Sequence, residues 1–139
     1  MHPPPRNPYN LLEALVEAYR RNELHHPKAD YPIDVRALLK ALNTHCFEPG
    51  QTLGAIERRY GLNDHNVSRR FAGHVGESPR AYRRRRRMEL AKRLLRHEGL
   101  QTIPIAQIAP AVGYGRHDSF TRAFKRYTGH APKQYRNAS

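Results

Sequence analysis

Apolar residues recur every three or four positions along much of the chain, and this spacing predicts helices. The first run lies within residues 11–24 and the second follows Asp34; their apolar members are Leu11, Leu12, Leu15, Val16 and Tyr19, then Val35, Leu38, Leu39, Leu42 and Cys46. Residues three and four apart lie on one face of an α-helix. No window shows the sustained period of two that a strand requires. The pattern therefore predicts an all-α fold.

Capping and breaking residues mark the ends of these first two helices. Asn10 and Glu13 have the spacing of a capping box, and His-His-Pro at residues 25–27 ends the helix that they open. Asp34 is expected to cap the second helix, and Pro49-Gly50 to stop it.

One pattern of residues occurs twice in the rest of the chain. Gly61 and Gly113 stand fifty-two residues apart, and Tyr82 and Tyr135 stand fifty-three apart. Each copy also carries an aromatic residue followed five positions later by glycine, namely Phe71 with Gly76 and Phe124 with Gly129. A near-constant period across several landmarks indicates that one structural unit is present twice.

Each copy has the pattern of a helix-turn-helix unit, at residues 52–71 and 104–126. In both, a short helix ends at a glycine, and a second helix buries two apolar residues four positions apart. The residues concerned are Thr52, Gly61, Asn63 as a cap, Val67 and Phe71 in the first copy, and Pro104, Gly113, Phe120 and Phe124 in the second. In such units the second helix enters the major groove of DNA.

A long helix is predicted between the two units. Ser78 followed by Pro79 is a strong helix start, and Gly99 ends the helix, which we place at residues 79–97. About 17 residues at ~1.5 Å each make a rod of about 25 Å. Such a rod can hold the two units at a separation close to one helical turn of DNA, ~34 Å. Pro132 then opens a last short helix.

Charge divides the chain into a neutral part and a basic part. The net charge is +13; residues 1–50 hold six Lys or Arg against six Asp or Glu, and residues 51–139 hold nineteen against six. Such asymmetry indicates a polyanionic partner for the basic part. We expect residues 1–33 to hold a proline-rich extended lead (1–9), a helix and a linker, and residues 34–139 to form the nucleic-acid-binding domain.

Several other classes of protein find no support in the sequence. Cys46 is the single cysteine, and the nine histidines do not cluster at ligand spacing, so we expect no disulfide, metal or cofactor. No nucleophile constellation or glycine-rich phosphate loop is present, so we expect no enzyme. The first residues lack the apolar core of a signal peptide, and no run approaches the ~18 apolar residues of a membrane span. We therefore expect a soluble, cytoplasmic protein.

With these motifs, residues 34–136 resemble the DNA-binding domain of AraC/XylS-type bacterial transcription regulators. The residues that carry the resemblance are Gly61-Leu62-Asn63, Gly76-Glu77-Ser78-Pro79, Tyr82, Arg87-Met88 and Ala91, then Gly113-Tyr114, Phe120 to Arg126, Gly129, Pro132 and Tyr135-Arg136. The resemblance implies a bilobal domain in which two helix-turn-helix units, joined by the long helix, present their recognition helices to successive segments of the major groove.

The resemblance also implies which side chains meet DNA. The positions that face the bases are His65, Ser68 and Arg69 in the first unit, and Arg116, His117, Asp118, Thr121 and Arg122 in the second. For the phosphates we expect contacts from Arg70, Arg83, Arg84, Lys125 and Arg126.

Three residues depart from the family's pattern. Glu57 stands where a small alanine is usual, and it must turn outward or find a partner, because an unpaired buried carboxylate is costly. Pro110 lies in the helix that supports the second recognition helix, where a kink or a late helix start is expected. Asp118 replaces a hydroxyl residue; it can accept a hydrogen bond from cytosine N4, or weaken binding by facing phosphates.

Several readings stay open at this stage. Arg69 and Arg122 can reach guanine through a bidentate fork, or can contact phosphate or a carboxylate of the protein. The five arginines 83–87 point around a whole helix, so only two or three of them can contact phosphates, and Arg87 has the position of an inward-leaning structural arginine. The helix at residues 11–24 can pack on the domain, as we favour, or pair with another chain.

The leading hypothesis is a sequence-specific, double-stranded DNA-binding transcription regulator that acts as a monomer on an asymmetric site. The resemblance implies RNA polymerase as a partner for an activator, while repression by occlusion is equally open. We expect the first unit to carry more of the base reading. The alternative is a protein-interaction module, residues 11–24, coupled to a basic region that binds nucleic acid without sequence preference.

Overall fold

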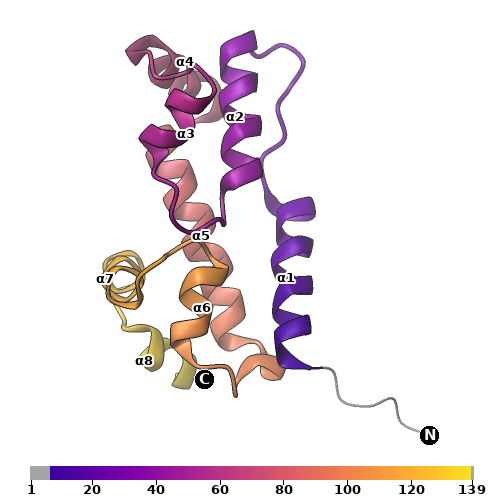
Figure 1. Ribbon diagram of the computed structural model, residues 1–139, viewed down its shortest axis with the longest axis vertical. Helices are drawn as coiled ribbons and strands as arrows, with labels where there is room; N and C mark the ends of the chain where they lie inside the picture. Colours follow the sequence, from indigo (N-terminus) through magenta and orange to yellow (C-terminus); the bar gives the residue numbers. More distant parts are fainter. Residues whose placement is uncertain (1–6, 139) are drawn as a thin grey trace, which may run out of the picture.

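The computed structural model describes residues 7–138, and every regular element in that range is a helix. The elements are α1 (Pro8–Glu23), α2 (Ile33–His45), α3 (Leu53–Arg59), α4 (His65–Val75), α5 (Pro79–Arg96), the 3-10 turn η1 (Glu98–Leu100), α6 (Ile105–Ala111), α7 (His117–Thr128) and α8 (Pro132–Asn137). They form two lobes stacked along the long axis of the molecule, with α5 running through both (Figure 1). The predicted all-α, bilobal architecture is confirmed.

Each lobe has its own hydrophobic core. The upper core is built from α2, α3, α4 and the start of α5, and its largest fully buried side chains are Leu38, Leu39, Leu42, Ile56, Phe71 and Tyr82. The lower core is built from α1, the second half of α5, α6 and α7, and its largest fully buried side chains are Met88, Leu90, Leu94, Leu95, Phe120 and Phe124. Because α5 contributes side chains to both cores, it fixes one lobe relative to the other.

The N-terminal helix α1 belongs to the lower core. Its residues Leu12 and Tyr19, with Leu24 just beyond its end, are 4 to 6% exposed. The ring of Tyr19 meets that of Phe47 edge to face, with centroids 5.8 Å apart, and the guanidinium of Arg93 lies 5.0 Å from the Tyr19 centroid. The interpretation that this helix packs on its own domain is therefore confirmed.

The start of α1 differs from the sequence prediction. Asn7, not Asn10, caps this helix: its side-chain oxygen accepts a hydrogen bond of 2.9 Å from the backbone N–H of Tyr9. Pro8 then occupies the first helical position, where proline loses nothing because that N–H has no helical partner. The extended lead predicted for residues 1–9 is thus wrong for Pro8 and Tyr9, and its residues 1–6 lie outside the described residues.

Two further caps were misplaced by one or two residues. Helix α2 begins at Ile33, so Asp34 lies inside its first turn, where one carboxylate oxygen accepts a 2.8 Å hydrogen bond from Val35 N–H. Asp64, not Asn63, caps α4 through a 2.9 Å bond from Asn66 N–H. A carboxylate and an amide cap equally well, so composition alone does not decide between neighbours.

The caps predicted for α3 and α5 are confirmed. The hydroxyl of Thr52 accepts a 3.0 Å bond from Ala55 N–H, and that of Ser78 accepts a 3.1 Å bond from Ala81 N–H. Within residues 7–138, no helix is both long and apolar enough to cross a lipid bilayer.

Candidate nucleic-acid interface

The first helix-turn-helix unit consists of α3 and α4. Gly61 adopts a φ of +68° in the turn, a left-handed conformation that glycine accepts without steric cost. Leu62 N–H then donates to the carbonyl of Glu57 over 2.7 Å, which closes the end of α3. Val67 and Phe71, on the inner face of α4, are 5% and 0% exposed and join the upper core. The outer face of α4 is thereby directed to solvent.

Glu57 finds a partner on the recognition helix. It is half-buried, and its carboxylate accepts a long hydrogen bond of 3.5 Å from the hydroxyl of Ser68. Ser68, predicted to face the bases, is itself half-buried and shared with this contact, whereas His65 and Arg69 are exposed. Neither His65 nor Arg69 forms an ion pair among residues 7–138.

Arg70, predicted to contact phosphate, is engaged inside the protein. Its guanidinium donates to the carboxylate of Asp34 on α2. The same contact lowers the pKa of Asp34 and raises that of Arg70. The pair ties the outer edge of α4 to α2, and a phosphate would have to compete with Asp34 for this side chain.

The second unit consists of α6 and α7. The turn contains Gly113 at a φ of +105°, and Tyr114 N–H donates over 2.9 Å to the carbonyl of Ala109. Phe120 and Phe124 are fully buried, with ring centroids 5.7 Å apart, and they anchor α7 in the lower core. This anchoring leaves a strongly basic outer face on α7.

Most residues predicted to touch DNA from the second unit are exposed. These are Arg116, His117, Asp118 and Arg122, with Lys125 and Arg126 in the last turn of α7. Thr121 is half-buried, and its hydroxyl donates over 3.0 Å to the carbonyl of His117. Arg116 and Asp118 pair with each other at 3.3 Å, and this contact lowers the pKa of Asp118. Asp118 is thus a charged carboxylate whose nearest cation is Arg116.

Pro110 disturbs the hydrogen bonding of α6 less than the sequence predicts. The helix begins at Ile105, directly after Pro104, so the late start that we considered is wrong. Pro110 lies in the last turn and lacks the N–H that would donate to Ala106, an exposed residue whose carbonyl water can reach. Because α6 ends at Ala111, one hydrogen bond is lost and no long helix is broken.

The run of five arginines on α5 divides between packing and surface. Arg87 is 7% exposed and donates to the carbonyls of Cys46 at 2.7 Å and Glu48 at 3.4 Å. The predicted structural role of Arg87 agrees with this burial. Arg83 is half-buried and donates to the carbonyl of Gln51.

The other three arginines of the run lie nearer to the surface. Arg86 donates to the carbonyl of Glu23 over 3.0 Å, and Arg85 pairs with Glu77 at 3.4 Å. Arg84 is exposed and has no ion-pair partner within residues 7–138. Of Arg83 and Arg84, the two arginines of the run that we expected to contact phosphates, Arg84 is therefore the one whose side chain forms no ion pair within the described residues and is exposed to solvent.

Arg87 also holds the two units against each other. Its guanidinium lies 5.3 Å from the ring centroid of Tyr114, in the turn of the second unit, while its hydrogen bonds go to the segment between α2 and α3. A Cβ atom placed on Gly113 would come within 2.7 Å of that guanidinium. The turn therefore requires glycine both for its φ and for this close approach.

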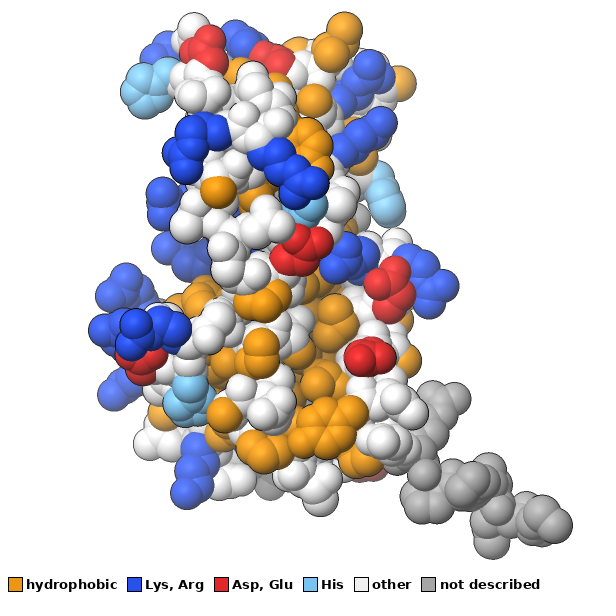
Figure 2. Space-filling view, in the orientation of Figure 1, with side chains coloured by type: hydrophobic (Ala, Val, Ile, Leu, Met, Phe, Trp, Pro, Cys, Tyr) orange, Lys and Arg blue, Asp and Glu red, His pale blue; other side chains and the backbone are white. Residues whose placement is uncertain are grey.

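Both recognition helices lie toward the same side of the molecule. In Figure 1, α4 and α7 project at the left, one from each lobe, with α5 between them and α1 on the opposite side. Figure 2 shows Lys and Arg side chains along that left edge, at the level of α7 and above it. A single elongated polyanion can therefore meet both recognition helices at once.

Comparison with known proteins agrees with this geometry. A family model described as a helix-turn-helix domain matches residues 56–138. The arabinose operon regulatory protein of Escherichia coli K12 is 29% identical over 129 residues, which cover 91% of this chain and 42% of that protein. The C-terminal domain of AraT, a response regulator from Geobacillus stearothermophilus, matches with a TM-score of 0.67 at 28% identity, over 80% of this chain and 89% of that one.

A second solved structure supports the same assignment. The C-terminal domain of the two-component response regulator yesN from Fusobacterium nucleatum matches with a TM-score of 0.62 at 27% identity, over 72% of this chain and 94% of that one. The fold and its two recognition helices define a DNA-binding helix-turn-helix protein. The chain belongs to the AraC-type family of transcription regulators. It spans less than half the length of the curated relatives that it matches.

Sequence reasoning missed one basic residue near the arginine run. Arg80 is exposed at the start of α5 and lies three, four and seven positions before Arg83, Arg84 and Arg87. Those offsets place the four side chains on one face of the helix. The signal was thus present in the sequence, but the consecutive run of arginines obscured it.

Proposed function

We propose that the protein is a sequence-specific, double-stranded DNA-binding transcription regulator that acts in the cytoplasm. The observation that carries this proposal is the placement of two helix-turn-helix units along one helix, with both recognition helices toward the same side of the molecule (Figure 1). The 18 residues of α5 make a rod of about 27 Å at ~1.5 Å per residue. This length suits two helices that enter successive major-groove segments on one face of the duplex.

The two units are proposed to contribute unequally to base recognition. Arg69 is exposed and unpaired within residues 7–138, and His65 lies beside it at the start of α4. On α7 the charge of Arg116 is offset by Asp118. We therefore propose that Arg69 reads guanine through a bidentate fork and that the second unit, through Lys125 and its neighbours, contributes mainly backbone contacts.

We also propose that the protein binds as a monomer on an asymmetric site. The apolar residues of α1 that could have paired with another chain all pack on the lower core: Leu12 and Tyr19 are buried in it, and Leu11, Leu15 and Val16 are half-buried against it. The alternative function, an interaction module at residues 11–24, therefore lacks the free apolar face that it needs. Sedimentation of the full chain tests whether the protein is a monomer. A chain truncated before α2 is not used, because removal of α1 would open the lower core. A dimer at micromolar concentration would contradict the proposal.

A competition experiment tests the function. Sites bound by the protein are selected from a random DNA pool, and binding to the selected site is measured at ~0.15 M salt against excess random DNA. A specific regulator retains its site, whereas a non-specific polycation loses its probe as readily as any competitor. Loss of the selected site at equal concentrations of random DNA would refute the proposal.

Substitution of Arg69 tests its role in base reading. We expect Arg69→Ala to cost ~1 to 3 kcal/mol on the selected site and much less on random DNA. Arg21→Ala is the matched control, since it removes an exposed positive charge from α1, away from the recognition helices. Equal losses on both DNAs would make Arg69 a phosphate contact, and a larger loss for Arg122→Ala would reverse the order of the two units.

A further inference from the structure

A pocket of about 540 Å³ lies between the two helix-turn-helix units. Its lining comes from three places: the start of α3 and the segment before it, α5, and the turn of the second unit. The residues are Gln51, Thr52, Leu53, Gly54, Arg80, Arg83, Arg84, Arg87 and Tyr114. Its volume falls within the ~300–1,000 Å³ that small-ligand sites occupy. The pocket thus has the size of a binding site and is shared by both units.

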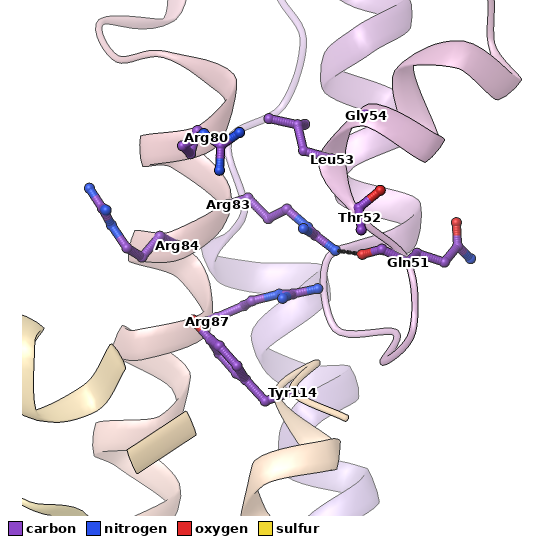
Figure 3. Close-up of a pocket in the computed structure, with 9 residues that line it drawn as sticks. All are labelled: Gln51, Thr52, Leu53, Gly54, Arg80, Arg83, Arg84, Arg87 and Tyr114. Atoms are coloured by element: carbon purple, nitrogen blue, oxygen red, sulfur yellow. Dashed lines mark hydrogen bonds between the residues drawn. The ribbon is translucent and has the colours of Figure 1, made fainter. Parts of the chain in front are cut away.

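The lining of this pocket is cationic. It holds four arginines and no Asp or Glu. Figure 3 shows Arg83 and Arg87 reaching from α5 toward the segment around Gln51, with Arg80 and Arg84 on the same helix nearer to its outer side. Arg80 and Arg84 are exposed and form the rim, while Arg83 and Arg87 form the floor. An apolar ligand would find little to bind here, whereas an anion would find several donors.

The floor of the pocket carries like charges that no carboxylate compensates. Burial, and then the charge of Arg87, lower the pKa of Arg83 to about 10. The Nε atom of Arg83 is buried and has no hydrogen-bond partner among the described residues. The guanidinium groups of Arg83 and Arg87 both donate to backbone carbonyls, which accept hydrogen bonds but carry no net negative charge. An anion in the pocket would supply the missing charge.

We propose that this pocket binds a phosphate group, held by Arg80 and Arg84 at the rim and by Arg83 at the floor. Guanidinium groups suit phosphate because their planar fork matches two of its oxygens. The group can come from the DNA backbone, where the duplex crosses between the two recognition helices, or from a free phosphate compound. Only the first source rests on the proposed function.

The experiment compares three proteins. The wild type is set beside an Arg80→Ala/Arg84→Ala double variant, whose changes fall on exposed rim residues and leave the buried floor intact. The control is an Arg21→Ala/Lys40→Ala double variant, which removes two exposed positive charges from α1 and α2, outside the pocket. The two variants have the same net charge, so a general charge effect appears in both.

The first measurement contains no DNA. Urea unfolding is followed with and without inorganic phosphate, at an ionic strength held constant with sodium chloride. At ten times its dissociation constant a bound ligand lowers the unfolding constant about 11-fold. We expect this effect in the wild type and the control, and less than about two-fold in the rim variant at the same phosphate concentration. Equal stabilisation of all three proteins, or of none, would overturn the site.

The second measurement locates the source of the phosphate. The slope of log affinity for duplex DNA against log salt is negative, and its magnitude falls by ~0.9 for each phosphate contact removed. A slope whose magnitude in the rim variant is smaller than in the control by about 0.9 assigns the pocket to the DNA backbone, because the pocket holds one phosphate. An unchanged slope, with selective stabilisation by phosphate, assigns it to a free phosphate compound.

The remaining outcome also decides the question. A salt slope of smaller magnitude in the rim variant, without selective stabilisation by phosphate, means that Arg80 and Arg84 contact DNA as separate surface charges. That outcome would refute the proposal that the pocket binds a phosphate group. Sequence discrimination is measured separately, by competition with random DNA. A failure of the proposed function therefore leaves the result of the phosphate titration intact.

Discussion

Replacement of Arg87 by alanine is expected to destabilise the protein by about 2 to 4 kcal/mol. The substitution removes a hydrogen bond of 2.7 Å to the carbonyl of Cys46 and a weaker one of 3.4 Å to that of Glu48. A hydrogen bond from a charged donor contributes about 1.5 to 3 kcal/mol, and the cation–π contact with Tyr114 adds ~0.5 to 2 kcal/mol. Burial disfavours the charged form of the Arg87 guanidinium and lowers its pKa, so its removal also removes an unfavourable contribution to folding and makes the net loss smaller than the sum of these contacts.

Urea unfolding monitored by circular dichroism measures the effect. With a slope near ~2 kcal/mol per molar urea, a loss of about 3 kcal/mol lowers the midpoint by about 1.5 M. Arg84→Ala is the matched control three residues earlier on the same helix; its side chain is exposed, so its cost is expected within ~0.5 kcal/mol. Equal midpoints for the two variants would refute the argument that Arg87 joins the lobes.

Three further outcomes are expected. Gly113→Ala should lower the free energy of unfolding more than Gly129→Ala, because both place alanine at a positive φ but only the first brings a Cβ atom against the Arg87 guanidinium. This difference should vanish when both substitutions are made in an Arg87→Ala protein. Equal destabilisation in the wild-type background would contradict the contact. Burial raises the pKa of the Cys46 thiol to about 11, so alkylation near pH 8 should track global unfolding, and prompt labelling of the native protein would contradict its burial. The guanidinium of Arg70 holds the pKa of Asp34 below its ordinary value. Their pairing therefore stabilises the folded protein fully above pH ~3.9, the pKa of an unfolded-state aspartate, and this stabilisation is lost as the pH falls through the pKa of the folded state. The stability deficit of Asp34→Asn at neutral pH should therefore close in acid, and a constant deficit would show that the pairing does not contribute.

Local sequence signals were sufficient to predict most of the helices. The apolar periodicity, the two turn glycines and the Ser78-Pro79 start are each decided within a few residues of where they act, and the structure agrees with them. The start of α1 also has a local signal, Asn7 followed by Pro8, but the neighbouring prolines favour assigning both residues to an extended lead. Such errors arise because neighbouring residues offer equivalent caps.

The partners of the arginines could not be read in the same way. Five identical side chains in succession differ only in what lies opposite them, and those groups are distant in sequence: Arg87 reaches Cys46, and Arg86 reaches Glu23. Arg70 likewise has a carboxylate partner on another helix, Asp34. Sequence reasoning therefore predicted that this face is basic, but not which cations the protein uses for its own packing.

The membership of the lower core has a consequence for how the chain folds during synthesis. Leu12 and Tyr19 are made about a hundred residues before Phe120 and Phe124, which belong to the same core. The upper core needs only residues from Tyr31 to Tyr82, so it can close while the ribosome is still adding α6 and α7. The apolar face of α1 packs on α5, η1 and α6, so it is covered completely only after these later elements have been made. The nascent chain thus passes through a stage in which the upper core is complete while the lower core still lacks α6 and α7.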